Sequence, residues 1–169
     1  MMDLAQELIK GNHRAIARAI SLAENNRSAA QEMMKKIFLG TGKSLVIGIT
    51  GPPGSGKSTL VDQMVVLLRK NGKKIGIIAV DPSSPFTGGA ILGDRIRMMR
   101  HSTDSEVFIR SMAARGHLGG LAKATGEVIT ILEAAGKDFI LVETVGVGQD
   151  EVEVVKLADI VLVILIPGA

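Results

Sequence analysis

The residues that most clearly indicate a chemical function lie in the loop 51–59. The loop reads Gly51-Pro52-Pro53-Gly54-Ser55-Gly56-Lys57-Ser58-Thr59. The loop matches the P-loop pattern G-x-x-x-x-G-K-[ST], with a strand-like run before it and a helical pattern after it. Its glycines let the backbone turn successive N–H groups toward phosphate oxygens. Lys57 supplies an ammonium group for the β and γ phosphates, and Ser58 supplies a hydroxyl for Mg²⁺. The loop therefore predicts a binding site for a nucleoside triphosphate.

Three carboxylates are candidates for holding the Mg²⁺ ion that accompanies such a nucleotide. Asp81 and Glu143 each follow an apolar, strand-like run, and Asp94 follows the segment 85–92. A carboxylate beyond a buried run is costly without a partner, and Mg²⁺ is a suitable partner. Each acid could instead cap the helix or turn that follows it. With that alternative open, the predicted metal-binding set is Ser58, Asp81, Asp94 and Glu143.

Two glycine-containing segments are candidates for sensing the γ-phosphate. In the run from Glu143 to Gly146, the glycine N–H could donate to the γ-phosphate, and hydrolysis would then release the loop that follows. The segment 85–92 is the other candidate switch. Gln149 could orient the attacking water, although it does not directly follow Gly146. The predicted catalytic residues are therefore Lys57, Glu143 and Gly146.

The histidines and arginines carry weaker predictions. His13 and His101 have no partners by spacing, and the lone His117 is expected to be a neutral variant rather than a ligand, so metal ligation through histidine is not expected. One arginine could stabilise the charge of the transition state as an arginine finger. For each arginine, however, we expect a place in a basic rim around the phosphate site. The arginines near the candidate switches are Arg95, Arg97, Arg100, Arg110 and Arg115.

Alternating strand and helix patterns must position these residues. Short runs of branched apolar residues predict strands at 44–50, 74–80, 106–110, 138–142 and 159–166. Helical patterns lie near 58–71, 93–100 and 120–135. Most of the runs lack polar alternation, as is typical of parallel strands covered on both faces. We therefore expect an α/β fold with a doubly wound, mainly parallel sheet, whose ligand lies beyond the carboxyl ends of the strands.

The chain divides into an N-terminal helical extension, residues 1–42, and a P-loop domain, residues 43–169. Apolar stripes predict two helices before Asn25 and a third over 28–38. Asn12 is the expected cap of the second helix. Met33 and Met34 are expected to fill core rather than to form a binding surface.

Composition excludes several classes of protein. A chain of 169 residues with 46% apolar and 22% charged residues suits one folded α/β domain and excludes wholesale disorder. The absence of cysteine excludes disulfides, thiolate metal sites and a cysteine nucleophile. A net charge of +3 and 2% aromatic residues do not indicate nucleic-acid binding. The apolar run 160–166 is too short to span a membrane, and the N-terminus lacks a signal-peptide layout, so a cytoplasmic protein without a membrane partner is expected.

Longer strings resemble the MeaB/ArgK/MMAA family of P-loop GTPases over nearly the whole chain. These strings lie at 81–98, 108–113, 115–116, 118–121, 143–149 and 167–169, and His117 stands where relatives are expected to carry a small polar residue. The resemblance implies a protein that binds GTP or GDP with Mg²⁺, hydrolyses GTP, and acts as a chaperone for an adenosylcobalamin-dependent mutase such as methylmalonyl-CoA mutase. Its implied role is to gate cofactor loading and to protect the mutase. The family's nucleotide loop maps onto Gly51 to Thr59, and its Mg²⁺-linked acids map onto Asp81, Asp94 and Glu143.

The resemblance also shows what this sequence does not contain. The Asn-Lys-x-Asp string that reads guanine, which in the family follows the strand ending near Pro167, is absent, as is the family's C-terminal dimerisation arm. We therefore expect a partial chain of a longer protein, with guanine specificity implied by the resemblance alone.

Three alternative readings stay open. Some family members are named ATPases or kinases of lysine/arginine/ornithine transport. A kinase acting on a small molecule or a protein would use the same loop, and a non-catalytic nucleotide-binding fragment is the third reading. Proline at positions 52 and 53 weighs against the MinD-like ATPases, whose loop carries a second lysine.

Overall fold

Five parallel strands form one sheet in the order β3-β2-β4-β1-β5. The computed structural model describes residues 3–25, 27–81, 99–113, 120–144, 152, 156–166 and 168. The strands are β1 (Leu45–Thr50), β2 (Ile75–Asp81), β3 (Val107–Ala113), β4 (Phe139–Thr144) and β5 (Ile160–Val163). The predicted α/β class with a parallel sheet is confirmed.

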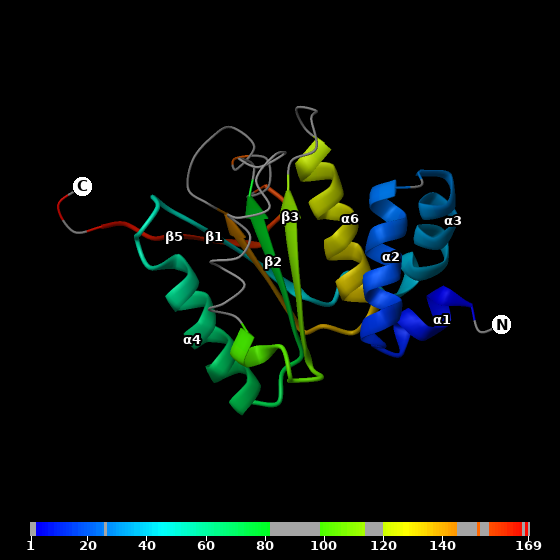
Figure 1. Ribbon diagram of the computed structural model, residues 1–169, viewed down its shortest axis with the longest axis horizontal. Helices are drawn as coiled ribbons and strands as arrows, with labels where there is room; N and C mark the ends of the chain where they lie inside the picture. The colour runs from blue at the N-terminus through cyan, green and yellow to red at the C-terminus, as the bar shows by residue number, and fades with distance from the viewer. Residues whose placement is uncertain are drawn as a thin grey trace.

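Helices cover both faces of this sheet (Figure 1). On one face, α4 (Lys57–Lys70) buries Val61 and Val65 in a cluster with the side chains of β1, β2 and β4. On the other face, α6 (Gly120–Ala134) buries Leu132 against the opposite side chains of the same strands. Each fully buried aliphatic side chain contributes about 1.5–3 kcal/mol to folding. The two clusters therefore fix where α4, and the loop before it, sit on the sheet.

Three N-terminal helices form an outer layer on α6 (Figure 1). They are α1 (Leu4–Ile9), α2 (His13–Asn25) and α3 (Arg27–Ile37), followed by the 3₁₀ turn η1 (Phe38–Gly40). Asn12 caps α2 as predicted, because its Oδ1 accepts from the N–H groups of Arg14 at 2.9 Å and Ala15 at 3.1 Å. Ile16 and Ile20 of α2 share one apolar cluster with α6. The division at residue 42 stays a prediction, and the apolar cluster runs across it.

An ion pair and a ring contact attach this outer layer to the edge strand β3. The guanidinium of Arg110 donates to both carboxylate oxygens of Glu24 in α2, at 2.8 and 2.7 Å. The rings of His13 and Phe108 meet edge to face at 5.4 Å. The expected place of Arg110 in a basic rim is therefore wrong, because its side chain points to α2.

The outer strand β5 differs most from its prediction. It ends at Val163, because β1 ends at Thr50 and offers no further partner in the register Thr50↔Val163. It begins after Asp159, whose carboxylate accepts from the N–H of Val46 at 2.8 Å. Ile160 and Val163 are 45% and 59% exposed, so among the described residues this strand lacks the covering on both faces that β1 and β4 have.

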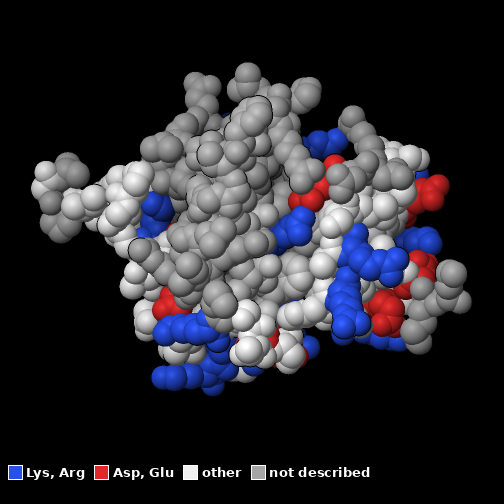
Figure 2. Space-filling model, viewed as in Figure 1, with Lys and Arg blue, Asp and Glu red and all other residues white. Residues whose placement is uncertain are grey.

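Basic side chains gather over the lower end of α4 in Figure 2. Arg69 and Lys70 lie in the last turn of this helix, where a positive charge complements the helix dipole. The turn η2 (Met99–His101) is described, whereas the start of the predicted helix 93–100 lies outside the described residues. Within the described ranges, none of the helices is both long and apolar enough to cross a lipid bilayer.

Candidate functional site

The carboxyl edge of the sheet brings the predicted loop and one predicted acid together. The loop 51–59 leaves β1 at Thr50 and leads into α4. Strand β4 lies between β1 and β2, with Glu143 level with Ile49 on one side and Ala79 on the other. Glu143 therefore lies directly beside the start of the loop. Asp81 ends β2 at the same edge, and its side chain lies outside what the structure describes.

The loop follows the backbone path that its glycines permit. Gly51, Gly54 and Gly56 have φ angles of +142°, +79° and +93°. Gly56 is the N-cap of α4 and carries no side chain to bond the first N–H groups of the helix. Those N–H groups also have no acceptor within the helix, and together with the helix dipole they favour an anion.

Lys57 places its ammonium group against the start of the loop. Its Nζ donates to the carbonyl oxygen of Gly51 at 2.8 Å and to that of Pro52 at 3.0 Å. The residue is only 6% exposed, and a charge so buried must be hydrogen-bonded. The loop thus holds one fixed positive charge at the position where the motif requires it.

Ser58 and Glu143 are brought together, as two members of the predicted metal-binding set. The Ser58 hydroxyl donates to Oε1 of Glu143 at 2.6 Å, a length typical of a hydroxyl bonded to a carboxylate. Glu143 is 6% exposed although it ends a strand. The contact joins residues 85 positions apart and places two hard oxygen donors beside the first turn of α4.

These groups fit a nucleotide with Mg²⁺. The hydroxyl oxygen of Ser55 is shielded from solvent and has no hydrogen-bond partner among the described residues, so it can bond a phosphate oxygen. Oxygen donors are the ligands that Mg²⁺ prefers. In the described part of the chain, no three acids or histidines cluster as a metal site. The remaining predicted residues, Asp94 and Gly146, lie outside the residues that the structure describes, as does Gln149.

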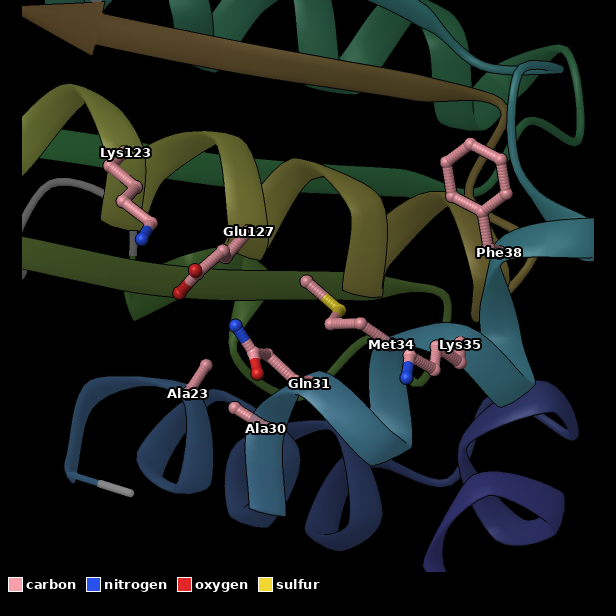
Figure 3. Close-up of a pocket in the computed structure, with 8 residues that line it drawn as sticks. All are labelled: Ala23, Ala30, Gln31, Met34, Lys35, Phe38, Lys123 and Glu127. Carbon is pink, nitrogen blue, oxygen red and sulfur yellow. The ribbon is translucent and has the colours of Figure 1, made fainter. Parts of the chain in front are cut away.

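A separate cavity of about 640 Å³ lies between α3 and α6 (Figure 3). Its wall is largely apolar, with a few charged side chains that include Lys123 and Glu127 of α6. No residue of the loop 51–59 lines it. Because this lining contains no paired nucleophile and base, we place the candidate site at the loop.

Helix α4 makes a second set of contacts that the sequence did not predict. Asp62 accepts from Arg100 and lies 2.9 Å from Nε2 of His101. Both partners belong to η2, so His101, for which spacing indicated no partner, has one. The only signal in the sequence was an acid four residues after Ser58, on the same face of a predicted helix.

Comparisons with known proteins agree with this geometry. The family described as methylmalonyl Co-A mutase-associated GTPase MeaB matches residues 16–169. A protein of Pyrococcus horikoshii is 60% identical over 166 residues, which are 98% of this chain and 52% of that protein. GTPase ArgK of Escherichia coli is 40% identical over 172 residues, 99% of this chain and 52% of its own length. A crystal structure of a protein named LAO/AO transport system kinase has 31% identity and a TM-score of 0.77, over 96% of this chain and 48% of that one. The chain spans about half the length of the curated relatives it matches.

Proposed function

The chain belongs to the MeaB family of methylmalonyl-CoA mutase-associated P-loop GTPases, and from this we propose that it binds GTP with Mg²⁺ at the loop 51–59 and hydrolyses it to GDP and phosphate. The observation that carries the proposal is the Ser58–Glu143 hydrogen bond of 2.6 Å, made by the residue that follows Lys57, whose buried ammonium bonds to the start of the loop. One positive group and two oxygen donors meet there at the N-terminus of a helix, which is the set that phosphoryl transfer uses.

Each residue then has a distinct role. Lys57 can exchange its two carbonyl acceptors for the β and γ phosphate oxygens, which carry more charge. Ser58 would hold Mg²⁺ through a lone pair of its hydroxyl while the proton stays on the bond to Glu143. Bound there, Mg²⁺ would neutralise charge on the phosphates. We assign Asp81 and Asp94 to the same ion, and we assign Gly146 as a γ-phosphate sensor.

The proposed biological role is that of a G-protein chaperone for an adenosylcobalamin-dependent mutase. The family description, which names methylmalonyl Co-A mutase, supports this role. The test is affinity capture from cell extract with the protein loaded either with GDP or with a non-hydrolysable GTP analogue. We expect a cobalamin enzyme that is retained in one nucleotide state more than in the other. Equal retention in both states, or no cobalamin enzyme, would count against the role.

A second candidate is a kinase linked to lysine/arginine/ornithine transport. It is favoured by the name of the solved relative with 31% identity, LAO/AO transport system kinase. The two functions differ in what accepts the γ-phosphoryl group. A GTPase transfers it to water, so released phosphate equals GTP consumed, whereas a kinase leaves part of it on an added amino acid or protein.

The guanine preference has its own test. A fluorescent GTP analogue bound to the protein is displaced by unlabelled GTP or ATP in the presence of Mg²⁺. In the full-length protein, with the base-reading segment that this sequence lacks, we expect GTP to compete at a concentration about a hundredfold lower than ATP, because a site that hydrogen-bonds the base edge leaves polar groups unpaired with the wrong base. Equal competition by ATP would overturn the GTPase assignment in favour of an ATPase.

A further inference from the structure

One face of α4 carries three polar side chains in line. Ser58, Asp62 and Arg69 are spaced by four and seven residues, which places them on one side of a helix. Ser58 bonds to β4 through Glu143. The other two bond to the segment 99–106, which contains η2 and the turn before β3. The helix that presents the P-loop side chains is therefore attached laterally to this segment.

The attachment nearer the start of α4 is made by the carboxylate of Asp62, which has two partners. Oδ2 of Asp62 accepts from Nη2 of Arg100, and Oδ1 lies 2.9 Å from Nε2 of His101. The side chains of Asp62 and His101 are only 14% and 11% exposed. Water therefore screens the pair less than it screens a surface pair. Arg100 is always charged, so its bond to Asp62 joins two opposite charges.

The attachment at the end of α4 is made by Arg69, and the segment 99–106 that it contacts is itself bonded to the sheet. Nε of Arg69 donates to Oδ2 of Asp104 at 2.7 Å, and this bond lowers the pKa of the Asp104 carboxyl. Oδ1 of Asp104 accepts from the N–H of Glu106, whose own carbonyl accepts from Ile75 of β2 at 2.9 Å. The segment is thus part of the sheet's framework, and Asp62 joins α4 to it.

Asp62 lies one helical turn from Ser58, or about 6 Å along the axis, whereas Arg69 lies about 16 Å away. We propose that Asp62 is a positioning residue of the nucleotide site, which holds the start of α4 in place through Arg100 and His101. The inference rests on the proposed function, because it concerns the placement of Lys57 and Ser58 for a nucleotide. Asp62 holds the part of α4 that carries Ser58, so release of this contact lets Ser58 shift relative to Glu143, whereas Arg69 holds the opposite end of the helix.

The test compares two ends of the same helix face. The affinity for a fluorescent GTP analogue is measured in wild type, Asp62→Ala, Asp62→Asn and, as the matched control, Arg69→Gln. We expect Asp62→Ala to weaken binding about threefold to tenfold, Asp62→Asn to weaken it less, and Arg69→Gln to lower only the unfolding midpoint in urea. If Arg69→Gln weakens binding as much as Asp62→Ala, the assignment is wrong. If wild type binds no nucleotide, the proposed function fails and the assignment fails with it.

Discussion

Gly51 opens the phosphate loop, and replacing it with alanine tests how closely that loop is packed. A Cβ at this position would lie 2.2 Å from the carbonyl oxygen of Ile164, which is backbone and cannot rotate away. Relief requires the chain at Ile164 to move by about 1 Å, which breaks the 2.8 Å bond from its N–H to the carbonyl of Thr50. The φ angle of +142° adds strain for any residue with a side chain. Together these terms lower the free energy of unfolding by about 3–6 kcal/mol.

Gly54 in the same loop is the matched control. Its φ angle is +79°, but a Cβ there has nothing within 4 Å. Gly54→Ala should therefore lower the free energy of unfolding by about 1–2 kcal/mol, which is the cost of placing a residue with a side chain in the left-handed conformation. Urea unfolding followed by circular dichroism is suitable, because the chain has no Trp or Tyr. Equal losses in the two variants would refute the packing argument.

Two further predictions concern charged groups. Glu143→Gln keeps an oxygen that can accept from Ser58 but removes the negative charge, so the Mg²⁺ concentration for half-maximal GTP hydrolysis should rise about tenfold. An unchanged Mg²⁺ titration would contradict the placement of Glu143 at the ion. Burial lowers the pKa of Lys137, whose Nζ donates to the carbonyl of Glu106. The unfolded chain therefore holds this proton more tightly, and the free energy of unfolding should rise with pH below about 10.4, relative to Lys137→Met. Urea curves at pH 7.5 and 10 that change equally for both proteins would contradict it.

Local sequence patterns predicted a strand well where the residue types within that strand are enough to indicate it. The apolar runs before the loop 51–59 and before Glu143 are strands buried on both faces, as continuous branched residues indicate. Strand β3 runs three residues beyond its prediction, because Arg110 and Ser111 interrupt the apolar run without interrupting the ladder to β2. The charge of Arg110 is accommodated by Glu24, 86 residues away, which no local pattern reveals.

The same distinction applies to the site. The motif placed Lys57 and Ser58 correctly at the start of α4, because strand, loop and helix are contiguous in sequence. The pairing of Ser58 with Glu143 follows from β4 lying next to β1, which is a property of topology. The contact of Asp62 with His101 depends on how the segment 99–106 returns to the sheet. Such contacts are long-range in sequence, so periodicity carries no information about them.

The central claim is that the loop 51–59 binds the phosphates of a nucleotide through Lys57. Calorimetric titration of GTP with Mg²⁺ into wild type, Lys57→Ala and the control Lys70→Ala, at the far end of α4, tests it directly. Loss of a charge-assisted hydrogen bond to phosphate should weaken binding at least about thirtyfold in Lys57→Ala. Lys70→Ala should bind as wild type does. Equal affinity in wild type and Lys57→Ala would contradict the account.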